Sequence, residues 1–375
     1  MYMVWSKTMK NNSKRKLKVA IICGTRPELI KLVPVIKELE ARGHEYRIFH
    51  TNQHYDANMD KNFWAELELE EKHICRNPKK FVFGNVIEWL KQKLEGYDVV
   101  LVQGDTNSVL AGALAGKFVN IPIGHIEAGI RSYDRRMQEE CNRQMVDRIS
   151  SFNFCPTDEA VERLVKENIP DKYNFITGNT IVDAVHKYSE NNKDFVKEVS
   201  GGEEYIFLTM HRAELVDNPS LLTKMVCLLN LISKKSKCKI IYPIHPRTKK
   251  MLDTFKIDIG KEIDNIKVID PVTFTQTLAL EKGAKLIITD SGGIQEEACI
   301  LGKPCLTIRD NTERQETLGI NNRLIKPSEV TKYLKGELLP TAPTVKGHNP
   351  YGDGNAGKNI VRILEDNLNG INNDN

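Results

Sequence analysis

The sequence lacks a long apolar run, because no stretch approaches the ~20 consecutive apolar residues that a membrane-spanning helix needs. It also lacks a marked excess of one charge, since 54 basic and 50 acidic side chains leave a formal net charge of +4. Spread over 375 residues, this charge is too small for the dense basic surface of a nucleic-acid binder. The composition therefore predicts neither a membrane nor a nucleic acid as a partner.

Several cofactor and disulfide motifs are absent as well. The 8 cysteines stand singly and form no CxxC pair, which disfavours a zinc ribbon, a thioredoxin-type site and a disulfide framework. The sequence contains no GxGxxG after its first apolar run, no GxxxxGK[ST] and no HExxH. We therefore expect reduced thiols, a cytoplasmic location, no NAD or other cofactor, and no metal.

The length suggests two domains, at about 150 residues per domain. The content of 28% charged and 40% hydrophobic residues is ordinary for a globular protein. The first residues, MYMVWSKTMKNNSKRK, contain too short an apolar part for a signal peptide. We predict that residues 1–17 form a disordered basic tail.

From residue 17 onward, short aliphatic runs alternate with amphipathic stretches. Runs of this length suit strands that are buried on both faces of a parallel sheet. They lie at 19–22, 99–102, 121–124, 152–155, 205–208, 239–242, 266–269, 286–289 and 304–308. The stretches 29–42, 106–118 and 294–301 have helical spacing. The alternation predicts an α/β fold with right-handed crossovers, which is a doubly wound architecture.

The alternation weakens once, between residues 185 and 204, where the chain is polar, charged and glycine-bearing. We place a linker there. The prediction is two doubly wound, Rossmann-like domains, 18–185 and 186–354, facing a cleft between the carboxyl ends of their strands. Ligands bind in such crevices in open α/β sheets.

The first polar cluster follows the first apolar run and reads GTRPE, from Gly24 to Glu28. A glycine turn that enters a helix offers backbone N–H groups and the positive end of the helix dipole to an anion. Arg26 and Lys31 add formal positive charge. The alternative is a plain turn with two solvated cations.

Three carboxylates follow successive apolar runs in the first half. Asp105 lies in QGDTNS, Glu127 in GHIEAG, and Glu139 opens a presumed helix. Because parallel strands end at one edge of a sheet, these carboxylates should converge on a site. Asp105 could instead be a simple N-cap, and Glu139 could pair locally with Arg143, four residues on.

The second half has the same organisation, with His211 and His245 following apolar runs. Its strongest cluster, TDSGGIQEE, combines a strand end, two glycines and a helix start, which is the geometry of a diphosphate cradle. Two acids one turn into that helix would repel phosphate, so at least one should hold a hydroxyl group, such as that of a ribose. Arg314, further along the chain, adds a positive charge to the cleft. The cluster supplies Ser291, Gly292, Gly293, Glu296 and Glu297.

Seven motifs in order, from about Lys18 to about Leu368, give the sequence a family resemblance. They are GTRPE, QGDT, HIEAG, EECNR, GNT, DSGGIQEE and HNPYGDG. Together they resemble the non-hydrolysing UDP-N-acetylglucosamine 2-epimerases. The resemblance implies a fold of the glycosyltransferase-B type, a homodimer, and a last helix, about 355–375, that returns to the first domain. It also implies reversible interconversion of the nucleotide sugars UDP-N-acetylglucosamine (UDP-GlcNAc) and UDP-N-acetylmannosamine (UDP-ManNAc), a step in polysaccharide precursor biosynthesis.

The resemblance also implies roles for individual residues. The sugar would lie among Asp105, Glu127 and Glu139, which are the implied catalytic carboxylates. His211 is implied both as a catalytic residue and as a contact of UDP. The remaining substrate contacts would be Arg26, Lys31, Arg143, Ser291, Gly292, Gly293, Glu297 and Arg314.

Elementary chemistry explains why such a site needs both cations and carboxylates. The C2 proton of a sugar nucleotide is not acidic, so the C1–O bond must break first. UDP would leave, the C2 proton would be removed to give 2-acetamidoglucal, and UDP would add back after the proton returns to the other face. Cations stabilise the departing diphosphate, and carboxylates near the ring stabilise positive charge and move the proton.

Four other activities remain open on the sequence alone. One is 2-epimerisation of a related UDP-diacetamido sugar, although the first loop of that relative is GARPQ-like rather than GTRPE. Another is a hydrolysing epimerase that releases free ManNAc. The last two are a retaining glycosyltransferase of the same fold and a non-catalytic nucleotide-binding module.

The resemblance finally concerns regulation. Bacterial members carry a second UDP-GlcNAc molecule that activates the reverse reaction, and its contacts would correspond here to Gln53, Arg212 and His245. The bacterial runs are QHRQ-like and HRRE, whereas this chain has QHYD and HRAE. Each run lacks a cation, and Asp56 adds a negative charge where a diphosphate would bind. The sequence therefore predicts weak or absent activation.

Overall fold

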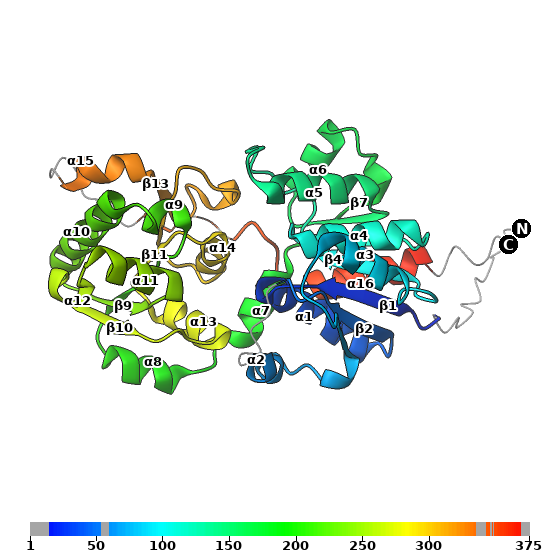
Figure 1. Ribbon diagram of the computed structural model, residues 1–375, viewed down its shortest axis with the longest axis horizontal. Helices are drawn as coiled ribbons and strands as arrows, with labels where there is room; N and C mark the ends of the chain where they lie inside the picture. Colours follow the sequence, from blue (N-terminus) through cyan, green and yellow to red (C-terminus); the bar gives the residue numbers. More distant parts are fainter. Residues whose placement is uncertain (1–14, 54–59, 335–342, 346, 348, 369–375) are drawn as a thin grey trace, which may run out of the picture.

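The computed structural model describes residues 15–53, 60–334, 343–345, 347 and 349–368 (Figure 1). Most of the predicted basic tail, residues 1–14, lies outside this range. Leu17, the last residue assigned to the tail, is fully buried, and its N–H donates to Nδ1 of His44 at 3.1 Å. The chain therefore joins the core slightly earlier than predicted, because Leu17 already packs beneath the first sheet.

The first α/β unit is built on a parallel sheet of seven strands in the described part of the chain, in the order β3-β2-β1-β4-β5-β6-β7. The strands are β1 (Lys18–Cys23), β2 (Glu45–His50), β3 (Ile74–Arg76), β4 (Val99–Gln103), β5 (Ile123–Ile126), β6 (Phe152–Cys155) and β7 (Asn174–Ile176). The helices are α1 (Arg26–Ala41), α2 (Asp60–Glu66), α3 (Phe83–Lys91), α4 (Asn107–Phe118), α5 (Gln138–Ile149), α6 (Asp158–Lys166) and α7 (Thr180–Tyr188), with 3₁₀ turns at η1 (Glu71–His73) and η2 (Asp171–Tyr173).

The second unit has a parallel sheet with the order β10-β9-β8-β11-β12-β13. Its strands are β8 (Tyr205–Thr209), β9 (Lys239–Pro243), β10 (Ile266–Ile269), β11 (Leu286–Thr289), β12 (Cys305–Ile308) and β13 (Asn322–Ile325). The helices from here to the end are α8 (Lys193–Ser200), α9 (Ala213–Val216), α10 (Pro219–Ser236), α11 (Pro246–Phe255), α12 (Ile259–Glu262), α13 (Phe274–Gly283), α14 (Gly292–Ile300), α15 (Val330–Leu334) and α16 (Ala356–Leu368), with η3 (Gln315–Thr317) and η4 (Pro327–Glu329).

Helices cover both faces of each sheet, which is why the central strands are continuous apolar runs. In β1, Val19 and Ile21 belong to the core on one face of the first sheet, and Ala20 and Ile22 belong to the core on the other. Successive strand residues point to opposite faces, so both sets must be apolar. This arrangement confirms the predicted α/β class with two Rossmann-like units.

The differences from the sequence analysis concern strands with weak patterns. Strands β2, β3, β7 and β13 were not predicted, because they mix polar and apolar residues or are only three residues long. Strand β5 begins at Ile123 rather than at Ile121. Pro122 lacks an N–H and contributes only its carbonyl, which accepts from Val100 at 2.9 Å.

The polar segment 185–204 is not an extended linker. It contains the end of α7 and all of α8, which packs against α13. One side of α8 is apolar enough for this, since Val199 is buried and Val196 packs into the core of the second unit. The chain crosses between the two sheets in this segment, and the domain boundaries themselves stay a prediction.

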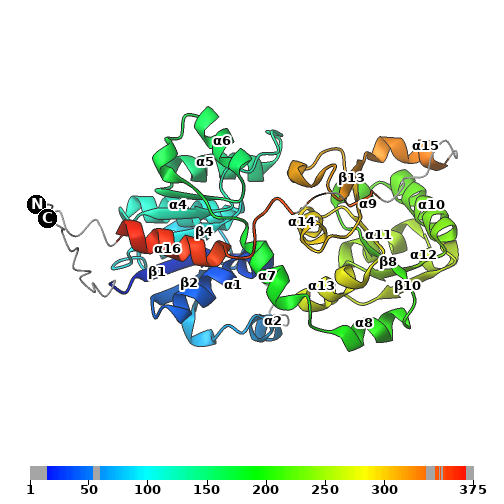
Figure 2. The same ribbon diagram turned by 180° about the vertical axis from the view of Figure 1, so that it is seen from behind.

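The chain returns to the first unit at its end, where α16 lies beside α1 (Figure 2). The two helices approach closely at Gly357, where a Cβ atom would stand 2.7 Å from the backbone of Pro34. At the other end of the contact, Glu365 binds Arg42 and His44, each at 3.0 Å. In the described part of the chain, no helix is both long and apolar enough to cross a membrane.

Candidate active site

Four charged side chains from the two units meet in a buried cluster between the sheets. Lys31 of α1 contacts Glu127, after β5, and Glu296 of α14, each at 2.9 Å. Arg314, after β12, contacts Glu127 at 2.7 Å and Glu296 at 2.9 Å. None of these side chains is more than 9% exposed. The cluster therefore joins the units through alternating charges. The alternative of a solvated cation is wrong for Lys31, which is buried and paired, whereas Arg26 is exposed.

Glu127 is held as an anion at the centre of this cluster. Burial opposes its charge, but Lys31 and Arg314 outweigh burial and lower the pKa of Glu127 below its usual range. The side-chain amide of Gln103 also donates to it. The backbone of Glu127 has a φ of +73°, in the left-handed region that non-glycine residues rarely adopt. Such strain persists only where the surroundings impose it, which is common at functional sites.

Asp105 lies at the end of the neighbouring strand and has different electrostatics. It forms an ion pair with Arg143 of α5. Burial raises the pKa of Asp105 above its usual value, Arg143 opposes this, and the negative charges of Glu127 and Glu139 act with burial. Asp105 is not an N-cap, because Thr106 occupies that position and accepts from the backbone of α4. That alternative is therefore wrong.

Hydrogen bonds to residues of β5 and α5 hold the turn that carries Asp105. His125, on β5 and fully buried, bonds Asp147 at 2.6 Å through Nδ1 and the carbonyl of Gly104 at 2.8 Å through Nε2. The side chain of Asn142 donates to the carbonyl of Asp105 at 2.9 Å. These bonds tie the turn after β4 to β5 and α5.

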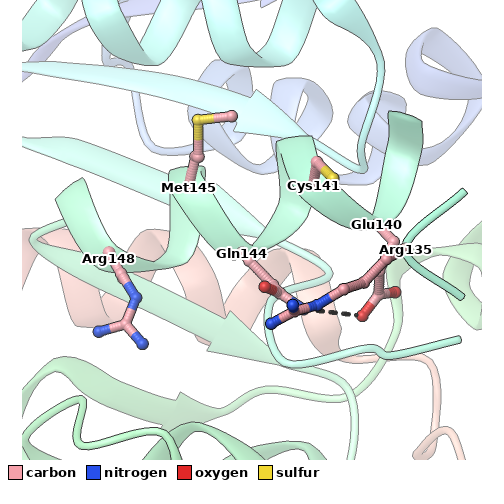
Figure 3. Close-up of a pocket in the computed structure, with 6 residues that line it drawn as sticks. All are labelled: Arg135, Glu140, Cys141, Gln144, Met145 and Arg148. Carbon is pink, nitrogen blue, oxygen red and sulfur yellow. Dashed lines mark hydrogen bonds between the residues drawn. The ribbon is translucent and has the colours of Figure 1, made fainter. Parts of the chain in front are cut away.

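Glu139, the third predicted carboxylate, is exposed on the first turn of α5. The alternative that it pairs with Arg143 is wrong, because Arg143 instead contacts Asp105 and Glu140, the latter at 3.5 Å. Glu140 also bonds Gln144 at 3.0 Å in an open pocket along α5 that Glu139 does not line (Figure 3). Glu139 acts on Asp105 through its charge, which places it on the side of the predicted site.

The GTRPE turn uses its backbone N–H groups internally. Glu28 accepts from the N–H of Gly24 at 2.6 Å and from that of Thr25 at 3.3 Å. Burial raises the pKa of Glu28 to about 7. These two amides are therefore not available to a phosphate, contrary to the sequence interpretation. Arg26 is exposed and stacks 4.9 Å from the ring centroid of Phe63.

Gly24 is required by packing, because a Cβ there would clash with the side chains of Ser108 and Thr51. The two glycines at the start of α14, Gly292 and Gly293, differ in the space around them. A Cβ at Gly292 would clash with Glu313, whereas at Gly293 the nearest atoms, Ser291 Oγ and Glu297 Oε1, are both 3.9 Å away. Only the Gly293 side is open to a ligand.

Ser291 is the N-cap of α14, but its hydroxyl forms no capping bond. The hydroxyl is therefore free to meet a group that approaches the helix start. The positive end of the α14 dipole lies at the same place, which favours an anion there.

His211 and His245 lie beside this turn. Nδ1 of His211 is 3.1 Å from Asp290, whose other oxygen accepts from the backbone of His211 and of Arg212, both at 2.7 Å. The rings of His211 and His245 are 5.2 Å apart. Together with Ser291, they line a cavity of about 230 Å³ whose walls include Phe207, Pro243, Pro271, Val272 and Ile294. The cavity offers an apolar slot with polar groups at one end.

The three possible regulatory residues do not form one contiguous group. Gln53 of the first unit accepts from the N–H and hydroxyl of Ser108, at 2.8 and 2.7 Å. Arg212 lies 3.6 Å from Glu214 in the second unit, and His245 lines the cavity beside Ser291. The substituted residues of the first run, Tyr55 and Asp56, lie outside the described residues. In the described part of the chain, no His, Cys, Asp and Glu side chains are grouped to hold a metal ion.

Sequence reasoning missed the separate roles of two adjacent acids. Successive residues of a helix point about 100° apart, so Glu296 and Glu297 face different neighbours. Glu296 faces Lys31, Arg314 and the amide of Asn179, which donates to it at 3.0 Å. Glu297 faces α13. No local pattern distinguishes them, because their partners lie far away in the sequence.

Comparison with known proteins shows the family to which the chain belongs. The family model described as UDP-N-acetylglucosamine 2-epimerase matches residues 37–365. The UDP-N-acetylglucosamine 2-epimerase of Methanococcus maripaludis is 47% identical over 92% of this chain and 98% of its own length. That of Methanocaldococcus jannaschii is 45% identical over 93% of this chain and 99% of its own.

The fold agrees as well. A crystal structure of the Methanocaldococcus jannaschii enzyme in complex with UDP-GlcNAc and UDP has a TM-score of 0.79 and 44% identity. The match covers 93% of this chain and 99% of that one. It confirms the two Rossmann-like units of the glycosyltransferase-B type.

Proposed function

Because the chain belongs to the UDP-N-acetylglucosamine 2-epimerase family and is an isomerase of that kind, we propose that it interconverts UDP-GlcNAc and UDP-ManNAc reversibly. The observation that best supports this proposal is the pair of carboxylates, Asp105 and Glu127, at the ends of neighbouring strands. The environment raises the pKa of Asp105 and lowers that of Glu127. Two acids with separated pKa values are the usual basis for separate acid and base roles.

The proposed reaction begins with cleavage of the C1–O bond. The bonding electrons leave with the β-phosphate oxygen, and an oxocarbenium-like ring forms. Removal of the C2 proton then gives 2-acetamidoglucal. Proton return to the opposite face and re-addition of UDP at C1 complete the epimerisation, so atoms and charge balance with no external oxidant or reductant.

The cluster suits this sequence of steps. Glu127, held ionised, supplies fixed negative charge for the developing positive charge of the ring. Asp105, whose pKa is raised by burial, is the proposed proton carrier. Arg314, Lys31 and the start of α14 supply positive charge for the departing diphosphate. Glu139, whose charge acts on Asp105, is proposed to act on the same sugar.

The nucleotide is proposed to bind the second unit. The cavity of about 230 Å³ beside Ser291 suits a uracil nucleoside, because apolar walls pack a base and polar ends fix its orientation. The diphosphate would then meet Gly293, Ser291 and His211. Glu297 would accept from the ribose, and Arg26 would approach the phosphates from the first unit.

A homodimer, a cytoplasmic location and a role in polysaccharide precursor synthesis complete the proposal, and they rest on the resemblance. The eight cysteines are all free, which is the usual state of thiols in a reducing compartment. The two relatives with 47% and 45% identity are named UDP-N-acetylglucosamine 2-epimerases, which favours UDP-GlcNAc over a UDP-diacetamido sugar as the substrate.

One incubation tests the proposed function. The protein is mixed with UDP-GlcNAc alone in deuterated water, in the presence of a chelator and without added NAD, and followed by NMR. We expect UDP-ManNAc that carries deuterium at C2, because the proton removed from C2 exchanges before it returns. Free ManNAc would instead indicate a hydrolysing epimerase, and an unchanged substrate would indicate a transferase or a binding module.

Regulation gives a second prediction. We expect UDP-ManNAc consumption to proceed without a lag and to respond little to a trace of UDP-GlcNAc. The chain lacks two cations of the bacterial pattern, and Asp56 adds a negative charge where the diphosphate would bind. A contact between two like charges near 4 Å costs on the order of 4 kcal/mol at an effective dielectric of about 20. Progress curves recorded with and without the trace measure this directly. A long lag that the trace abolishes would show that the regulatory site works despite the substitutions.

A further inference from the structure

The second unit buries a carboxyl group that the proposed reaction does not use. Glu281, on α13, is fully buried. Among the described residues, no N–H or hydroxyl donates to either of its carboxyl oxygens. Its hydrogen-bonding neighbour is another acid, Glu297 of α14. Two carboxylates cannot bond each other without a proton, so the pair must retain at least one.

Among the described residues, no cation lowers the pKa of Glu281, and the nearest effect of this kind is that of Lys31 on Glu297. Strand β8 contributes Tyr205, whose hydroxyl donates to the carbonyl of Leu280 at 2.6 Å, and β12 contributes the thiol of Cys305. Helix α14 adds the carboxyl of Glu296 beside Glu297. Lys282, next in sequence, instead pairs with Glu190. A buried carboxylate without a cation is strongly disfavoured, which keeps the proton on the pair.

The proton belongs mainly to Glu281. Burial raises the pKa of Glu281 well above its usual value, and the charge of Glu297 raises it further. Burial also raises the pKa of Glu297, but the hydrogen bond from Glu281 and the charge of Lys31 oppose this. Glu281 is therefore the donor, and Glu297 is the acceptor and the first of the two to ionise.

Glu297 links this pair to the open side of the Ser-Gly-Gly turn. Its Oε1 lies as close to Gly293 as the hydroxyl of Ser291 does, at 3.9 Å from the position of a Cβ there. A group bound at this turn would therefore meet the Glu297 carboxylate. A vicinal diol suits it, because a carboxylate accepts charge-assisted bonds from two hydroxyls.

We propose that Glu281 is a positioning residue for nucleotide binding: as a neutral acid it donates its proton to Glu297 and holds that carboxylate toward the ribose diol of the nucleotide. This inference rests on the proposed function, since the ligand is the UDP moiety. When the pH exceeds the raised pKa of Glu281 and this group loses its proton, the two carboxylates repel each other and Glu297 leaves its position. A group whose pKa is raised by folding contributes below that pKa, so UDP affinity should fall as the pH rises.

The test is the UDP affinity measured by calorimetry from neutral to strongly alkaline pH, where the phosphates of UDP are fully ionised. Four proteins are compared: the wild type, Glu281→Gln, Glu281→Leu and Tyr205→Phe. The last removes a hydrogen bond to α13 without touching the carboxyl pair, and therefore controls for disturbance of the helix. We expect wild-type affinity to fall by about tenfold or more over the range, the scale of one lost charge-assisted bond.

The amide of Glu281→Gln can donate but cannot ionise. We expect it to avoid most of the loss seen in Glu281→Leu at neutral pH and to lack the steep alkaline fall. Glu281→Leu should bind about tenfold more weakly throughout, and Tyr205→Phe should follow the wild type. Ionisation of uracil affects all four proteins alike.

Identical pH profiles in the wild type and Glu281→Gln would overturn the role of Glu281 while leaving the nucleotide site intact. Absence of UDP binding to the wild type at every pH would instead overturn the proposed function. Glu281→Gln decides the question even if Glu281→Leu fails to fold, because the amide has nearly the same shape as the acid.

Discussion

Replacing any one of the three carboxylates, as Asp105→Asn, Glu127→Gln or Glu139→Gln, is expected to lower turnover by roughly 10²-fold or more, the usual scale for acid–base groups. The reasons differ. Asparagine keeps the size of Asp105 but cannot carry the proton. Glutamine at Glu127 removes the fixed negative charge and leaves Lys31 and Arg314 with one anion, Glu296. UDP binding should persist, because the proposed nucleotide site lies in the second unit.

The measurement is the initial rate of UDP-ManNAc formation at saturating UDP-GlcNAc, together with UDP affinity by calorimetry. Glu162→Gln is the matched control, since Glu162 is 66% exposed on α6 and pairs with Lys166 on the surface. It should retain wild-type turnover. Near-native turnover in all three amide variants would mean that the reaction takes place elsewhere.

Combining Ser291→Ala with Arg26→Ala is expected to weaken UDP binding by several kcal/mol, at ~1.5–3 kcal/mol for each hydrogen bond that involves a charged group. By the affinity scale this is roughly 10²- to 10⁴-fold in Kd. The hydroxyl of Ser291 is not engaged in capping α14, and Arg26 is an exposed cation beside Phe63, so both are the proposed contacts of the phosphates.

Calorimetry with UDP on the single and double variants checks this expectation. Arg148→Ala serves as the control for loss of a positive charge, because Arg148 is exposed and lines the pocket along α5 (Figure 3). An unchanged UDP affinity in the double variant would place the nucleotide away from α14.

The sequence predicts what depends on the ends of parallel strands. Asp105 and Glu127 follow neighbouring strands of one sheet, so their convergence follows from topology alone. The capping-box pattern from Thr25 to Glu28 was also present in the sequence, and it explains why the amides of that turn are already bonded. The same residues also match the pattern of an anion site, and the capping box is the interpretation that agrees with the structure.

Contacts between the two units could not be predicted in this way. Lys31 and Glu296 are separated by 265 residues, and Arg314 and Glu127 by 187. Nothing in the local pattern selects Glu296 over Glu297 for that cluster, because the selection depends on how α14 faces α1. The edge strand β3 was missed for a related reason, since half-exposed strands carry polar residues that resemble loops.

The return of α16 to the first unit has a consequence for biosynthesis. Ile360, Val361 and Leu364 complete the same core as residues of β1 and α1. During translation, the face of α1 that they cover stays open while the whole second unit emerges from the ribosome. Domains usually fold in the order of their synthesis. Here the first unit is synthesised first but completes its folding last. A chain that stalls before α16 would present apolar surface to chaperones and proteases.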